Sequence, residues 1–114
     1  MNSVYEPRIE INHAAKGGKG QVIMKHLLEK EMMGDKCTLY AEVTIHPGST
    51  LGYHVHEGDS ESYYIISGEG IYTDDNVTRR VKAGDVTFTP SGHGHAMEPV
   101  GDKPIVFMAM ILKD

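Results

Sequence analysis

The chain has one cysteine and no tryptophan among its 114 residues. A single cysteine cannot form an internal disulfide, so a disulfide-stabilised fold is excluded. The longest apolar run, Pro104–Leu112, is about half as long as a membrane-spanning helix. The first ten residues include Glu6, Arg8 and Glu10 and no apolar leader. We therefore expect a cytoplasmic protein that has no membrane partner.

Basic charge is also scarce. Lysine and arginine number 11 against 16 acidic residues, which gives a formal net charge of −5. The densest basic run, Arg79–Lys82, is too short to form a patch for phosphates, so we expect no nucleic-acid partner. The length and an ordinary content of 39% hydrophobic residues predict one domain that spans residues 1–114.

Short segments of alternating apolar and polar residues make up most of the chain, and glycine, proline and Asp/Asn turns separate them. This pattern predicts an all-β sandwich or barrel. The expected strands are Gln21–Leu27, Cys37–His46, Gly52–His56, Ser62–Ser67, Gly70–Thr73, Val77–Lys82, Val86–Thr89, His95–Pro99 and Ile105–Leu112. Lys25–Met33 is a competing helix, because its residues are good helix formers.

The N-terminal region, residues 1–20, is expected to be an arm before the first strand. Its glycine-rich end, Lys16–Gly20, resembles a phosphate-binding loop, but it does not have the required spacing, so a flexible connection is the better interpretation. Cys37 begins an alternating apolar segment, which favours a buried strand thiol over a nucleophile.

Two histidines one residue apart, His54 and His56, are the first candidate ligands. Side chains at i and i+2 of a strand share a face, so both would point inward. A turn through residues 57–60 would bring Glu61 back beside them. Glu57 is the rival carboxylate, but it directly follows His56 and would point to the opposite face, so we choose Glu61.

A second segment, Gly84–His95, contains Pro90 and Gly92, which allow the chain to reverse and place His95 at the start of a strand. Together the two segments resemble the paired motifs of the cupin family. The first motif is matched by Gly48, His54, His56, Glu61 and Gly68, and the second by Gly84, Pro90, Gly92 and His95. Pro99 stands where the second motif ends in asparagine, a position outside the ligand set.

This resemblance implies a jelly-roll barrel, the double-stranded β-helix, with a metal-binding core at about residues 48–99. It implies that His54, His56, Glu61 and His95 bind one metal ion. The small acidic chain resembles in particular the oxalate-decarboxylase-like cupins. Three imidazoles and one carboxylate suit a divalent transition metal: we favour manganese, with iron, nickel, cobalt or zinc as alternatives.

Four protein ligands would leave an octahedral ion two adjacent positions for a small chelating ligand such as oxalate. We therefore expect a metal-dependent enzyme that acts on a small carboxylate or keto acid, by decarboxylase, lyase, isomerase or dioxygenase chemistry. Two alternatives remain open. One is a non-catalytic cupin that binds a small anion or sugar, and the other is a metal-stabilised structural or accessory protein.

Three further residues are weaker candidates. His93 is a possible acid or base at the rim of the pocket, although a solvated loop histidine is the simpler interpretation. Tyr63 shares the strand face of Glu61 and would either line the pocket or pack in the core. Arg79 alternates with two valines and would either meet a substrate carboxylate or lie exposed. His13, His26 and His46 have no place in the motif and are interpreted as ordinary histidines.

Two segments are apolar on both alternating faces, Ile105–Leu112 and Tyr63–Ile66. A barrel strand needs only one apolar face for the interior. The second face must cover another sheet or another chain, so we expect a homodimer.

Overall fold

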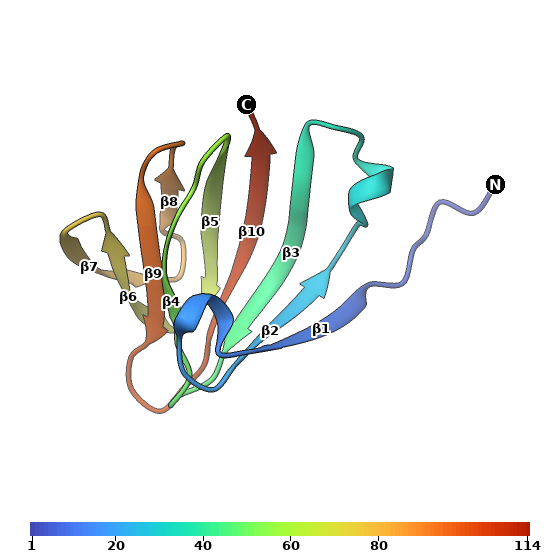
Figure 1. Ribbon diagram of the computed structural model, residues 1–114. Helices are drawn as coiled ribbons and strands as arrows, with labels where there is room; N and C mark the ends of the chain where they lie inside the picture. Colours follow the sequence, from blue (N-terminus) through green and yellow to red (C-terminus); the bar gives the residue numbers. More distant parts are fainter.

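The structure is a computed structural model that describes residues 1–114 and consists almost entirely of β-strands (Figure 1). The strands are β1 (Arg8–His13), β2 (Gln21–His26), β3 (Cys37–Ile45), β4 (Leu51–Val55), β5 (Asp59–Ser67), β6 (Glu69–Asp74), β7 (Val77–Lys82), β8 (Val86–Thr89), β9 (Gly94–Pro99) and β10 (Ile105–Lys113). Two single-turn 3-10 helices, η1 (Ala15–Gly17) and η2 (Lys30–Met32), lie between the first strands. No helix of this structure has the length and apolar character needed to cross a membrane.

The strands form two antiparallel sheets, as expected for the double-stranded β-helix. One sheet has the order β1-β2-β3-β10-β5-β8, and the other has the order β4-β9-β6-β7. Their inner faces enclose a core that is centred on β3, β5 and β10. The fully buried core side chains include Ile45, Tyr63, Ile65, Ile105 and Phe107. The all-β prediction is confirmed.

The N-terminal region differs from our prediction, because residues 8–13 form strand β1 at the edge of the larger sheet (Figure 1). β1 pairs with β2 along its whole length, from Arg8 opposite His26 to His13 opposite Gln21. The region expected to be an arm therefore extends one sheet of the barrel. The helix at Lys25–Met33 is absent, since β2 runs to His26 and only η2 is helical.

The glycine-rich connection after β1 is held against β4, so the expected flexible connection is wrong. The backbone N–H of Thr50 donates to the carbonyl of Lys19 at 2.9 Å, and the N–H of Lys19 donates to the hydroxyl of Thr50 at 2.9 Å. A Cβ atom at Gly18 would clash with the carbonyl oxygen of Thr50. Glycine is therefore required there for close approach of two backbones.

The outer face of the larger sheet is apolar, as the two-sided patterns of β5 and β10 predict. Ile105, Phe107 and Ala109 are buried, whereas Met110 and Leu112 are exposed on the opposite face of the same strand. Neighbouring strands add further exposed apolar side chains to this outer face: Tyr64, Ile66, Val86 and Phe88. Cys37 is a half-buried thiol in β3 that donates to the carbonyl of Leu39 at 3.3 Å.

Candidate metal centre

His54 and His56 lie at the end of β4 and point to the same side, as their spacing predicts. Nδ1 of His54 lies 2.8 Å from the carbonyl oxygen of Gly52, and Nδ1 of His56 lies 2.8 Å from Oδ1 of Asp59. Because a carbonyl and a carboxylate only accept hydrogen bonds, both Nδ1 atoms carry the proton. The lone pair of each Nε2 is therefore free to bind a metal ion.

His95 comes from β9, where it pairs directly with His54 across the smaller sheet. Its imidazole is fully buried, and two buried hydroxyls lie against Nδ1: Tyr72 Oη at 2.8 Å and Thr89 Oγ1 at 2.9 Å. A hydroxyl can accept the Nδ1 proton, and in that tautomer the lone pair of Nε2 of His95 faces the other two imidazoles. All three histidines thus present Nε2 to one point.

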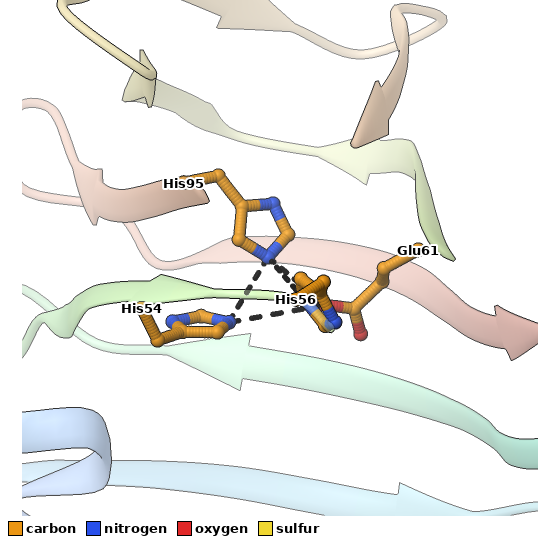
Figure 2. Close-up of side chains that lie close together, drawn as sticks. All are labelled: His54, His56, Glu61 and His95. Atoms are coloured by element: carbon orange, nitrogen blue, oxygen red, sulfur yellow. Dashed lines mark hydrogen bonds and ion pairs between the residues drawn. The ribbon is translucent and has the colours of Figure 1, made fainter. Parts of the chain in front are cut away.

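Glu61 supplies the fourth donor from β5, in the opposite sheet. Its side chain is buried, and Oε1 lies 2.9 Å from Nε2 of His56 and 3.0 Å from Nε2 of His95. Figure 2 shows the four side chains converging. Glu57, the rival carboxylate, is exposed and lies outside this cluster.

The distances between donor atoms provide a test of whether a metal ion fits. With bonds of about 2.1 Å, adjacent donors of an octahedral ion lie about 3.0 Å apart and opposite donors about 4.2 Å, whereas all tetrahedral edges are about 3.4 Å. Of the six separations among the four donor atoms, four are 2.9 to 3.0 Å, and the one from His54 to Glu61 is 4.0 Å. The cluster fits an octahedral ion.

The electrostatics of the cluster also favour a cation. Nε2 of His95 lies 3.0 Å from Nε2 of both His54 and His56, and the Nδ1 atoms of His54 and His56 carry their protons. Lone pairs that face one another at this distance repel unless a positive charge lies between them. The chemistry of the donor set therefore fits one metal ion that His54, His56, Glu61 and His95 could hold.

Burial and neighbouring groups set the protonation of these ligands. Burial tends to raise the pKa of the Glu61 carboxyl, but its contacts with the three imidazoles outweigh burial and lower that pKa, so Glu61 is ionised. Burial lowers the pKa of His95, which keeps this imidazole neutral at pH 7. The hydrogen bond with Glu61 raises the pKa of His56, so a metal ion that binds there would displace a proton, because ionised carboxylates and neutral imidazoles are the forms that bind metals.

A cavity of about 600 Å³ opens beside the cluster between the two sheets. His54, His56, Glu61 and Tyr63 line one part of it. The Tyr63 hydroxyl donates to Oε1 of Glu61 at 3.2 Å and lies 3.3 Å from Nε2 of His95. Burial raises the pKa of Tyr63, so its hydroxyl stays protonated and acts as a donor. The sequence left open whether Tyr63 lines the pocket or packs in the core, and in the structure it does both.

The structure places the other two candidates away from the cavity. Nδ1 of His93 pairs with Asp75 at 2.6 Å, its side chain is half exposed, and it is not among the cavity-lining residues. Arg79 is exposed on β7, with its Nε 3.8 Å from a carboxylate oxygen of Asp74. It too is absent from the cavity lining. For His93 the structure shows the solvated loop histidine, and for Arg79 it shows the exposed alternative, so neither the rim position nor the inward position is found.

Sequence reasoning missed several residues that the structure places at the site. Asp59, Tyr72 and Thr89 orient the histidines, and they carry no motif signal of their own. Glu10 and His26, from β1 and β2, also line the cavity and form a pair at 2.7 Å. Strand register alone brings these two residues to the cavity, and register is not visible in a short sequence pattern.

A double-stranded β-helix with a histidine-rich cluster between its sheets defines the class of protein. Residues 41–111 match the family model of the cupin domain, which covers more than half of the chain. The chain belongs to the cupin family.

Within the cupin family, the chain is similar to proteins whose names refer to oxalate. The chain is 47% identical over 97 residues to an oxalate-binding protein of Thermotoga maritima, a match that covers 85% of this chain and 80% of that protein. It is 35% identical over 79 residues to the oxalate decarboxylase OxdC of Bacillus subtilis, which covers 65% of this chain but only 20% of that enzyme. The crystal structure of a predicted oxalate decarboxylase from Thermotoga maritima matches with a TM-score of 0.91 and 42% identity. That match covers 100% of this chain and 99% of that one.

Proposed function

We propose that the protein binds one divalent transition metal ion through His54, His56, Glu61 and His95 and holds a small carboxylate on that ion. The observation that carries this proposal is the set of four donor atoms at octahedral separations beside an open cavity. Mixed nitrogen and oxygen donors suit manganese first, and iron, nickel, cobalt or zinc next. The likeness to an oxalate-binding protein supports a carboxylate as the ligand.

The arrangement of the donors explains why a chelating acid is the expected ligand. His54 and Glu61 are opposite, whereas His56 and His95 are adjacent. An octahedral ion held in this way would have its two remaining positions next to each other, which leaves room for a chelating ligand. Oxalate or a 2-oxo acid spans two adjacent positions as a chelate, and its negative charge offsets the charge of the cation.

Decarboxylation is the second candidate function, and the Tyr63 hydroxyl favours it. This hydroxyl lies beside Glu61 and His95, where it can donate a hydrogen bond to a bound acid. Similarity to oxalate decarboxylase supports the same reaction class. Catalysis also needs a group that takes or gives a proton at neutral pH. The raised pKa of Tyr63 makes it a weak acid, so binding is the function that we place first.

The test is calorimetric titration of oxalate and pyruvate into protein that has been stripped with chelator and reloaded with manganese(II). We expect one metal ion per chain and acid binding only to the loaded protein. The double change His54→Ala and His95→Ala should abolish both, whereas His93→Gln should leave both intact because His93 lies outside the cavity. Loaded protein that binds no acid at millimolar concentration would contradict the proposal. Release of carbon dioxide from oxalate would show that the protein is a decarboxylase and not only a binding protein.

The proposal includes a homodimer, joined through the outer face of the larger sheet. That face exposes apolar side chains from three adjacent strands: Tyr64, Ile66, Val86, Phe88, Met110 and Leu112. A contiguous apolar face of this kind is uncommon on a monomer. A two-fold axis through the sheet would cover it with the same face of a second copy.

A further inference from the structure

The cavity extends well beyond the metal centre along one row of the larger sheet. His26 lies opposite Ala41, Ala41 opposite Ala109, and Ala109 opposite Tyr63. Neighbouring strands are about 4.8 Å apart, so the row separates the backbones of His26 and Tyr63 by about 14 Å. Both of these end residues line the same cavity.

Small side chains keep this row open. The two residues between His26 and Tyr63 are alanines, and Ala109 itself lines the cavity. Larger apolar side chains form the rest of this part of the lining, among them Met24, Leu39, Val43, Phe107 and Ile111. A volume of about 600 Å³ corresponds to about twenty water molecules, far more than a two-carbon acid displaces. The apolar lining is therefore not explained by oxalate.

Charge is distributed unequally along the cavity. A divalent ion at the cluster exceeds the charge of Glu61, so the metal end is positive. Besides Glu61, three carboxylates and one lysine, Lys16, line the cavity. Asp59 contacts Nδ1 of His56 at the metal end, Glu57 directly follows His56, and Glu10 lies at the other end in its pair with His26. A second carboxylate of the ligand that reached past the metal to β1 and β2 would meet Glu10 there and be repelled.

We propose that the cavity takes a monocarboxylate with an apolar body, such as a 2-oxo acid with a branched or aromatic side chain. The inference rests on the proposed function, because the metal ion holds the acid group. The body lies over Ala109 toward the pair formed by His26 and Glu10. Its burial removes apolar surface from water on both the ligand and the cavity lining.

The test compares three acids that share one metal-binding head. All three carry the 2-oxo acid group that would bind the metal, and pyruvate has only a methyl group beyond it. 4-Methyl-2-oxopentanoate adds a branched apolar chain, and 2-oxoglutarate adds a chain of similar length that ends in a second carboxylate. Calorimetric titration into the manganese-loaded wild type should show that 4-methyl-2-oxopentanoate binds roughly tenfold more tightly than pyruvate. It should also bind more tightly than 2-oxoglutarate.

Ala109→Leu is the matched variant, because Ala109 lines the cavity and is not one of the four metal ligands. It should remove the advantage of 4-methyl-2-oxopentanoate and leave pyruvate affinity and metal content unchanged. Ala109→Val is the smaller change if the leucine variant does not fold, and it should reduce the same advantage in part. Circular dichroism and metal analysis verify the fold and the loading of each variant.

The outcomes separate this inference from the proposed function. Pyruvate and 4-methyl-2-oxopentanoate that bind equally would overturn the inference alone, since the acid site would still exist. Equal losses for both acids in Ala109→Leu would also overturn it. Tighter binding of 2-oxoglutarate would show that the acidic lining does not select, and would reject the monocarboxylate class. Failure of every acid to bind the loaded protein would overturn the proposed function as well.

Discussion

Nε2 of His54 and Oε1 of Glu61 lie 4.0 Å apart, whereas each lies about 3.0 Å from Nε2 of His95. These separations would suit an octahedral ion that His54 and Glu61 hold from opposite sides.

The first prediction is that protein loaded with cobalt(II) has the weak visible absorption of an octahedral ion and not the strong bands of a tetrahedral one. Absorption spectroscopy during titration with cobalt(II) measures this. Glu61→Gln should lower the metal affinity by roughly 100-fold, since it removes the one anionic ligand. Strong tetrahedral bands in the wild type would contradict the octahedral assignment.

The second prediction concerns the two hydroxyls behind His95. Tyr72 and Thr89 lie against Nδ1, and a hydroxyl that accepts the Nδ1 proton leaves Nε2 as the metal-binding nitrogen. The double change Tyr72→Phe and Thr89→Val should weaken manganese binding by about 10- to 100-fold while the protein stays folded. Competition with a chelator gives the affinity.

Two controls separate positioning of His95 from a general structural role. Tyr64→Phe removes a hydroxyl from the outer face of the sheet and should have no effect. The variant Tyr72→Phe with Thr89→Ser keeps one hydroxyl at position 89. It should regain most of the manganese affinity that the double change Tyr72→Phe and Thr89→Val loses. An unchanged affinity in the double variant would mean that the hydroxyls do not position His95.

The sequence predicts the cluster well because its geometry is mostly local. Alternation along a strand places His54 and His56 on one face, and one turn returns Glu61 to them. His93 shows the limit of this reasoning. It is two residues before His95, but β9 begins at Gly94, and His93 pairs outside the cavity with the carboxylate of Asp75 from the turn between β6 and β7.

Features that depend on strand register could not be predicted. β1 was missed because Glu10 and Asn12 face the cavity, so the segment lacks the apolar inner face that identifies a strand. Likewise, Thr89 reaches the site because β8 pairs with β5 opposite Glu61. Such pairings join residues far apart in the chain, and nothing in the local pattern encodes them.

The third prediction is a pH dependence at the β1 edge. Arg8 donates to both carboxylate oxygens of Glu29, and this contact lowers the pKa of Glu29. The ordinary pKa of this carboxyl is 4.5. Because the pKa is lower in the folded state, the contact stabilises the protein at pH values above 4.5, and this contribution is lost as the pH falls through the folded-state pKa. Glu29→Gln should therefore reduce the free energy of unfolding slightly near pH 7 and not at about pH 3.

Urea denaturation of the two proteins at both pH values measures this difference. High salt should also reduce the difference near pH 7, because both groups are exposed. Glu98→Gln changes an exposed glutamate on β9 for which the structure shows no ion pair, and it should have no such pH-dependent effect. A difference between wild type and Glu29→Gln that persists at low pH would assign the effect to packing and not to charge.

The last prediction is that charge on the outer face of the larger sheet prevents dimerisation. Phe88 and Met110 are 60% and 38% exposed there, and a carboxylate at either position would be buried without a partner in the dimer. The double change Phe88→Glu and Met110→Glu should weaken self-association by about 100-fold or more, which sedimentation equilibrium measures at micromolar concentration. Val77→Glu is the matched control, since Val77 is also about half exposed but lies on β7 in the other sheet. A wild type that sediments as a monomer, or a Val77→Glu variant that dissociates equally, would show that this face does not form the interface.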